Sequence, residues 1–218
     1  MNDEPSNDKR RGLTTAGTRA VGAVTERNPD GKGVIAFLRD WDYSTPRGVV
    51  AKPRPQVMAD YFTSLLVLSA SMPFKPVFNK DYYLYTDGDA WQLSLISPDE
   101  WRSAQKQEQF VGTCQLHDDS TWSIEPSENL RDDGVVAAAV ATFFDRFIES
   151  LSNDSPLEDG LPLCRFQLTY YPRLFAAALS RSVKTSLRYA GDLDVPATRW
   201  LEAVPTSANR LLGPAPSK

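Results

Sequence analysis

A β-hairpin is predicted by the segment YYLYTDGDAWQLSL at residues 82–95. Two runs rich in aromatic and aliphatic side chains flank Asp87-Gly88, and Asp-Gly between two such runs is a strong turn signal. In the second run Trp91, Leu93 and Leu95 share one face, because successive side chains of a strand point to opposite faces. We therefore expect one face of this hairpin to be buried.

A second hairpin is expected further along the chain. Residues 110–116 alternate between two faces, and the segment 117–120 is rich in Asp and Ser, which favour turns. Trp122 and Ile124 then continue an inward-facing set, and a further alternating run at 164–170 predicts another strand. The expected fold is α+β, an antiparallel four-to-five-stranded β-meander packed by amphipathic helices.

The helices are predicted from apolar spacing and from end signals. Apolar side chains recur at three-to-four spacing over residues 56–71 and 134–151. Pro172 and Gly191 frame a longer helix, since Pro favours the first turn of a helix and Gly its end. Shorter helices are expected at 98–107 and 196–203. These segments supply the layer that covers the sheet.

Composition suggests how the 218 residues are organised. We expect a disordered N-terminal arm at 1–33, an α+β core at 34–155, a C-terminal strand-helix extension at 156–204 and a flexible tail at 205–218. The first 33 residues lack the apolar run of a signal peptide, and no run reaches the ~18 residues needed to span a bilayer. Two cysteines form no disulfide framework. A cytoplasmic protein without membrane insertion is therefore expected.

The segment SPDEW at residues 97–101 has the pattern of a helix start. Ser97 and Glu100 have the spacing of a capping box, and Pro98 falls at the first helical position. Asp99 and Glu100 would both be stabilised as anions there, which suits neither a general acid nor a base of raised pKa. We interpret this segment as structural, with catalytic carboxylates as the alternative.

Residues in and around this segment also resemble a known protein family. The pattern comprises YYLY at 82–85, Gly88, LISPDEW at 95–101, FVG at 110–112, Leu116 and DSTW at 119–122. It resembles a domain-of-unknown-function family, number 2452, over residues of about 72–126. The family has no established activity, so the resemblance implies a shared fold region and no particular chemistry.

Charge is unevenly distributed along the chain. The net charge is −4, but residues 99–159 hold 14 acids and 4 bases, whereas residues 160–191 hold five bases and no acid. On the predicted helix after Pro172, Arg181, Lys184 and Arg188 fall close to one stripe. This stripe is either an ordinary solvated face or a docking face for an acidic protein, a phosphate group or nucleic acid.

Aromatic side chains offer a second candidate surface. Tyr83 and Tyr85 share one face of the first strand. If they are exposed they would form a recognition surface, and the alternative is that they pack in the core or beneath a helix.

The residues favour a non-catalytic interaction or adaptor protein, or an accessory subunit, that binds another protein. No cofactor is predicted, and a single His with two Cys does not suggest structural zinc. One alternative is an enzyme that uses several of a set of acidic and histidine residues, which would have to converge in one cleft: Asp40, Asp42, Glu100, His117, Asp118 and Asp119. The other is an anion or nucleic-acid binder that uses Arg181, Lys184 and Arg188.

Overall fold

The sheet confirms the α+β prediction. The structure, a computed structural model, describes residues 33–131, 134–152, 154–162, 168–208 and 211–212. Four antiparallel strands, β1 (Asp81–Thr86), β2 (Trp91–Ser94), β3 (Phe110–Leu116) and β4 (Trp122–Pro126), lie in the order β2-β1-β3-β4. Of the predicted further strand, residues 163–167 lie outside the described residues, and Tyr170 begins a helix.

The strand order differs from a simple meander, because β3 pairs with β1 and not with β2. The outer edge of β2 is already occupied: Ser71 forms backbone hydrogen bonds there with Trp91 and Leu93, at 2.8 and 3.0 Å. The free edge available to β3 is therefore that of β1. The chain reaches this edge through an excursion over residues 95–109.

Both predicted turns are present. Gly88 has a φ of +104° between β1 and β2, and Ser120 has a φ of 64° between β3 and β4. A Cβ atom at Gly112 in β3 would collide with the carbonyl oxygen of Glu125 in β4, so glycine allows these strands to approach closely. The local turn signals in the sequence thus correspond to the observed hairpins.

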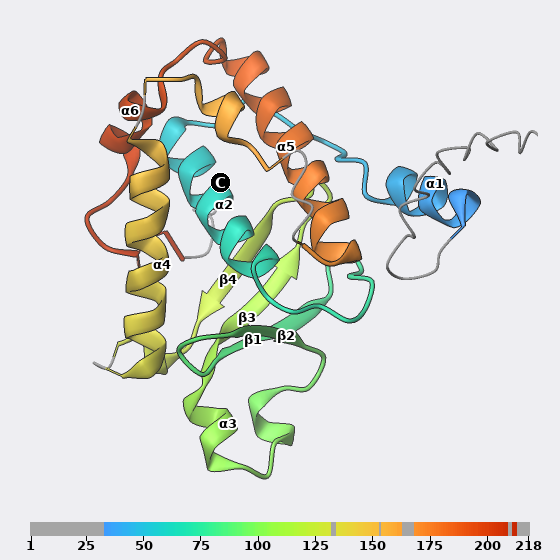
Figure 1. Cartoon of the computed structure of the whole chain (residues 1–218), viewed down its shortest axis with the longest axis vertical. Coiled ribbons are helices and arrows are strands. Elements are labelled where there is room, and N and C mark those ends of the chain that lie inside the picture. The colour runs from blue at the N-terminus through green and yellow to red at the C-terminus, as the bar shows by residue number, and fades with distance from the viewer. Residues whose placement is uncertain (1–32, 132–133, 153, 163–167, 209–210, 213–218) are drawn as a thin grey trace, which may run out of the picture.

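Helices cover the sheet and form the core with it. Figure 1 shows α2 (Arg54–Leu68) between α4 (Val135–Leu151) and α5 (Tyr170–Ala190), with the sheet beneath them. Phe62 of α2 packs edge-to-face against three rings of α4, those of Phe143, Phe144 and Phe147. The Ser64 hydroxyl of α2 accepts a hydrogen bond from the backbone N–H of Trp122 in β4, at 2.9 Å, which ties the helix layer to the sheet.

The predicted helix at 98–107 is interrupted. A 3₁₀ turn, η1 (Pro98–Glu100), begins at the predicted capping box, in which the Ser97 backbone N–H donates to the Glu100 carboxylate at 2.8 Å. Trp101 is extended, with φ −80° and ψ 126°, and α3 (Ala104–Glu108) begins only after it. This kink turns Trp101 edge-on to the ring of Tyr85. The aromatic contact accompanies the break in the helix.

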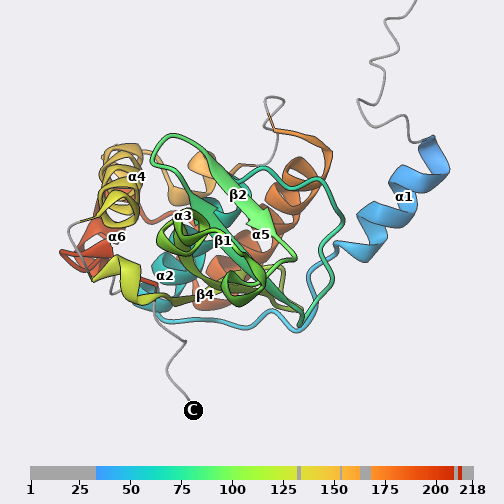
Figure 2. The ribbon, with the colours of Figure 1, turned by 90° about the horizontal axis from the view of Figure 1, so that it is seen from below.

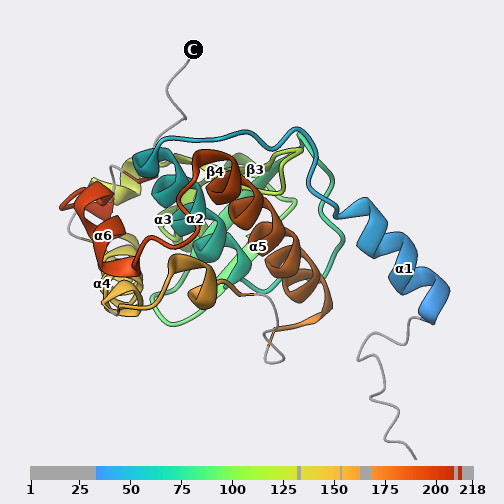
Figure 3. The ribbon, with the colours of Figure 1, turned by 90° about the horizontal axis from the view of Figure 1, so that it is seen from above.

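The N-terminal part of the described chain contains a helix and a connector. The helix α1 (Val34–Tyr43) projects from one side of the body in all three overall views (Figures 1, 2 and 3). Residues 44–53, which we call the connector, link it to α2. The predicted arm at 1–33 lies outside the described residues except for Gly33, the N-cap of α1.

The C-terminal part packs into the same core. The predicted helix at 196–203 is present as α6 (Ala197–Trp200) and the 3₁₀ turn η4 (Leu201–Ala203), and two further turns are η2 (Glu128–Leu130) and η3 (Leu157–Gly160). Leu211 and Leu212, in the segment predicted as a flexible tail, are buried. In the described part of the chain, no helix has the length and apolarity needed to span a membrane.

Candidate anion-binding groove

A groove of about 500 Å³ lies between α5 and the connector. Helical residues that are three and four positions apart lie on one face, so Arg181, Lys184 and Arg188 of α5 line it together. The opposite wall comes from the connector, where Thr45, Pro46, Gly48 and Val49 lie. The structure thus brings the three predicted basic residues into one depression of the surface.

Arg181 occupies the inner part of this groove. Its guanidinium lies 4.2 Å from the centre of the Trp41 ring, and its NH1 and NH2 groups donate to the hydroxyls of Thr45 and Ser44 at 3.3 and 3.4 Å. Burial lowers the pKa of Arg181, and no carboxylate within the described residues forms an ion pair with it. Its buried Nε also has no hydrogen-bond partner among them. A partly buried cation without a counter-charge is unfavourable, and an anion in the groove would relieve this cost.

The other two cations differ in how freely they can bind a ligand. Lys184 forms an ion pair with Glu158 at 2.8 Å, so part of its charge is already neutralised. Arg188 is exposed at the outer end of the groove, beside Tyr189, which is 62% exposed. Arg181 and Arg188 therefore provide most of the available positive charge.

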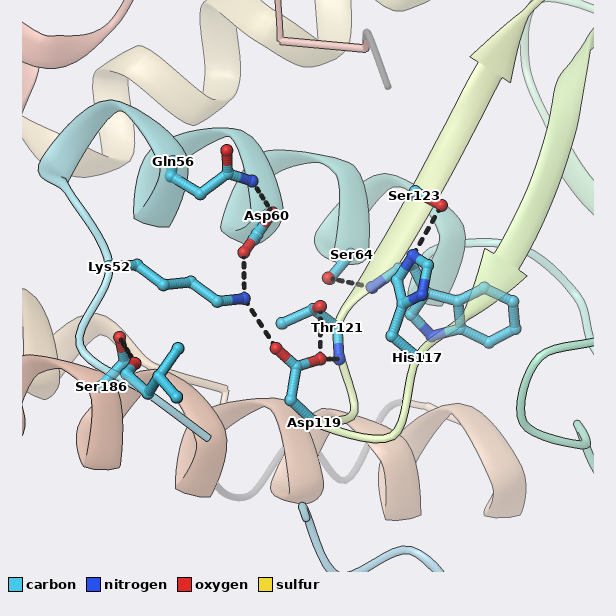
Figure 4. A network of polar contacts seen from close by, with 11 residues as sticks. Lys52, Gln56, Asp60, Ser64, His117, Asp119, Thr121, Ser123 and Ser186 are labelled. Carbon is cyan, nitrogen blue, oxygen red and sulfur yellow. Dashed lines mark hydrogen bonds and ion pairs between the residues drawn. The ribbon is translucent and has the colours of Figure 1, made fainter. Parts of the chain in front are cut away.

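The connector is held by a polar network, drawn in Figure 4. Lys52 donates from Nζ to Asp60 of α2 at 2.5 Å and to Asp119 of the β3–β4 turn at 2.6 Å. The Ser186 hydroxyl of α5 donates to the carbonyl oxygen of Val50 at 2.8 Å. These bonds attach the wall of the groove to α2, to the sheet and to α5, so the groove is a built feature of the fold.

The two carboxylates that share Lys52 are affected in opposite directions. Burial, with the charge of nearby Asp119, raises the pKa of Asp60, although Lys52 and Gln56 act to lower it. Burial also opposes ionisation of Asp119, but hydrogen bonds from Lys52 and Thr121 outweigh it, and the pKa of Asp119 falls. Burial lowers the pKa of Lys52, but its two carboxylate partners outweigh this effect, and the net pKa is raised. This arrangement stabilises a protonated lysine that is held between the two carboxylates.

The candidate acids on α1 and at η1 are Asp40, Asp42 and Glu100, and their side chains lie in different surroundings. Asp40 accepts from Lys75 Nζ at 2.7 Å and from the Tyr170 hydroxyl at 3.0 Å. Asp42 is exposed on α1. Glu100 is engaged in its capping box, where the backbone N–H and hydroxyl of Ser97 lower its pKa. These carboxylates do not share a site.

The three candidate residues at the β3–β4 turn also contact different side chains. His117 Nε2 lies 2.7 Å from the Ser123 hydroxyl, whereas Asp118 accepts from the Asn79 amide at 3.2 Å. Asp119 faces Lys52 in the network described above. Within the described residues, no group of three His, Cys, Asp or Glu side chains is placed to hold a metal ion. The six residues of the enzyme hypothesis therefore do not converge in one cleft.

The tyrosine pair lies largely beneath other side chains. Tyr85 is buried, its hydroxyl donates to the carbonyl oxygen of Ile96 at 2.9 Å, and its ring contacts Trp101 and Phe110. Burial raises the pKa of Tyr85 to about 12. Tyr83 is half-buried and also contacts Phe110. The packing alternative weighed from the sequence matches this arrangement better than an exposed pair.

Some residues in and beside the groove have no signal in the sequence. Trp41, Thr45 and Lys52 lie in or beside a segment that shows only proline-rich, irregular character. They meet α5 across a separation of more than a hundred residues, as between Thr45 and Arg181.

Comparison with known proteins finds a match for only part of the chain. No curated protein and no solved structure matches the chain. The matched region, residues 57–144, contains most of α2, the whole sheet and the first part of α4, and leaves the connector and α5 outside it. Residues 57–144 of this chain match the model of the family described as a protein of unknown function, DUF2452.

Proposed function

We propose that the protein is a non-catalytic interaction module whose groove binds an anionic side chain of a partner protein. The observation that carries the proposal is Arg181, a partly buried guanidinium that faces the groove with no carboxylate paired to it among the described residues. Charge-assisted hydrogen bonds to a carboxylate or a phosphate would satisfy it. Arg188 at the outer end would add a second cation.

A short anionic segment fits the groove better than a long polyanion does. The positive charge is confined to three side chains of α5, while the whole chain carries a net charge of −4. A nucleic acid that extended beyond the groove would meet this acidic surface, and its binding depends on many phosphate contacts. A protein segment with one or two acidic side chains places its charge only where the cations lie.

An intracellular setting is part of this proposal. Cys114 is a free, buried thiol in β3, and burial raises its pKa. A buried neutral thiol behaves as a small apolar side chain and is compatible with a reducing compartment. The cytoplasm supplies such conditions.

The proposal is tested by fluorescence anisotropy with three labelled probes: a hexaglutamate peptide, a pentapeptide that contains phosphoserine, and a single-stranded oligonucleotide. We expect at least one peptide to bind and its affinity to fall as salt rises. Arg188→Gln should weaken this binding about three- to tenfold, because it removes one charge-assisted contact. The control is Arg199→Gln, another exposed arginine, which lies outside the groove and pairs with Glu202.

The outcomes separate the candidate functions. A stronger response to phosphoserine than to glutamate would identify phosphate as the anion, and the reverse would identify a carboxylate. Binding of the oligonucleotide alone would replace the proposal with the nucleic-acid alternative. Equal losses in both arginine variants, or no binding of any probe, would overturn it.

A further inference from the structure

The helix α1 buries a charged residue and leaves much of its apolar surface exposed. Its one buried residue is Asp40, whereas Val34, Ile35 and Leu38 are 73%, 77% and 57% exposed. A surface helix normally buries its apolar stripe and exposes its charges. The orientation of α1 is therefore the reverse of what its own sequence favours in an isolated molecule.

Polar contacts hold α1 in this orientation. Asp40 accepts hydrogen bonds from Lys75 and Tyr170, and Lys75 Nζ also lies 3.8 Å from the centre of the Tyr43 ring. Lys75 and Tyr170 belong to different parts of the chain, and Tyr43 of α1 packs against Phe78, so these contacts fix which face of α1 points inward. Within the described residues, Val34, Phe37 and Leu38 stay exposed on the outer side of the helix.

The outer side of α1 carries an apolar stripe formed by Val34, Phe37, Leu38 and Trp41. These residues follow the i, i+3, i+4, i+7 spacing that places side chains along one side of a helix. Phe37 and Trp41 are 6.0 Å apart between ring centroids and are each partly exposed. A helix of a partner that presents apolar side chains at the same spacing would match this stripe.

The stripe ends where the groove begins. Trp41 is the last residue of the stripe, and its ring contacts the guanidinium of Arg181, which lines the groove. Thr45, one turn further on, lines the groove itself and accepts from Arg181. The contact between Trp41 and Arg181 thus joins the apolar stripe of α1 to the cationic groove.

We infer that the apolar stripe of α1 and the groove form one docking surface for an acidic amphipathic helix of a partner protein. Apolar side chains of the partner pack on the stripe, and its carboxylates reach Arg181 and Arg188. The inference rests on the proposed function for the anionic half of this surface. Charge complementarity selects the occupant, because the cations at the end of the stripe require an acidic neighbour.

Two other occupants fit less well. A membrane-surface helix carries Lys and Arg on its polar side, whereas α1 carries one arginine, Arg39, against Asp40 and Asp42. A second copy joined through the stripe alone would leave Arg181 and Arg188 without an anion. An acidic helix satisfies both halves of the surface at once.

The test uses a labelled 16-residue designed peptide with Leu at i, i+3, i+4 and i+7 and Glu at the flanking positions. Two matched peptides replace either the Leu by Ser or the Glu by Gln. We expect only the parent peptide to bind well. Leu38→Ser should weaken its binding about tenfold, since a buried leucine contact is lost. The control Leu95→Ser changes a similarly exposed leucine, 51% against 57%, that is not on the stripe.

The variants distinguish failure of this inference from failure of the proposed function. If Arg188→Gln weakens peptide binding and Leu38→Ser does not, the result supports the proposed anion-binding groove and contradicts a role of α1 in docking. If Leu38→Ser weakens peptide binding and Arg188→Gln does not, the result contradicts the proposed binding of anions in the groove. Two further results would overturn the docking inference: a dimer by sedimentation that Leu38→Ser converts to monomer, or binding to vesicles of anionic phospholipid in place of the peptide.

Discussion

At the scale of single residues, one lysine connects three parts of the fold. Lys52 lies between Asp60 and Asp119, and each carboxylate has a different set of further donors. Asp119 accepts from both the backbone N–H and the hydroxyl of Thr121, at 3.0 and 2.6 Å, whereas Asp60 accepts from Gln56. The two acids are therefore not equivalent, although both contact the same ammonium group.

This difference predicts unequal costs of neutralising the two acids. Asp119→Asn should lower the free energy of unfolding by about 1.5–3 kcal/mol, because charged hydrogen bonds are lost. Asp60→Asn should cost less than about 1 kcal/mol, because burial already disfavours the ionised Asp60. Urea denaturation at neutral pH measures both. A cost for Asp60→Asn that equals that of Asp119→Asn would contradict the assignment.

The lowered pKa of Asp119 also predicts how the free energy of unfolding decreases at acidic pH. The pKa of Asp119 is lowered in the folded protein, so its contribution is complete above the ordinary value of about 3.9 and is lost as pH falls through the lowered value. Between pH ~5 and ~3, Asp119→Asn should therefore lose less stability than the parent protein does. A parallel decline in both proteins would be inconsistent with this sign.

At the scale of elements, α1 illustrates how a few polar bonds can outweigh an apolar pattern. Asp40, Trp41 and Tyr43 attach it to the rest of the chain, whereas Val34, Ile35 and Leu38 stay exposed. Such an element should open locally without unfolding of the core. Its position beside the groove makes this local stability relevant to binding.

Replacement of Asp40 should therefore release α1 selectively. In Asp40→Ala we expect amide hydrogen exchange over residues 34–43 to accelerate by at least about tenfold, since the bonds to Lys75 and Tyr170 are removed. Exchange in α2 should change little. Asp42→Ala, an exposed acid of the same helix, is the control. Unchanged protection of α1 in Asp40→Ala would show that other contacts hold it.

At the scale of the whole molecule, the C-terminal segments share one core with α2 and the sheet. The helix α5 packs against α2, and the Thr63 hydroxyl of α2 donates to the carbonyl oxygen of Leu211 at 3.1 Å. Leu212 is fully buried in the same hydrophobic cluster. The described residues beyond 156 thus contribute to the same core and do not form an appended lobe.

This shared core predicts a cooperative loss of stability from a change near the C-terminus. Leu212→Ala should lower the free energy of unfolding by about 2–5 kcal/mol, the usual cost of a large-to-small change in a core. Unfolding should remain a single transition by circular dichroism and by fluorescence. Leu95→Ala, at an exposed leucine, should stay within about 0.5 kcal/mol. A similarly small effect for Leu212→Ala would argue for a separate tail.

Local patterns account for the elements that were predicted correctly. Asp87-Gly88 specifies its turn through residues that tolerate unusual backbone angles, and the apolar periods at 56–71 and 134–151 follow from helical geometry. The basic stripe of α5 was likewise visible from spacing alone. Each of these features depends on neighbours a few positions apart, which a single sequence displays directly.

Contacts between distant segments account for what could not be predicted. The strand order depends on Ser71 occupying the edge of β2, and the groove depends on the connector lying across α5. The inverted α1 depends on Lys75 and Tyr170, which are far from Asp40 in the chain. The sequence therefore predicted the four strands of the sheet, most of the helices and the cationic stripe of α5. Their pairing, and with it the groove, was set by tertiary structure, because edge occupancy and long-range polar bonds depend on where the whole chain places its parts.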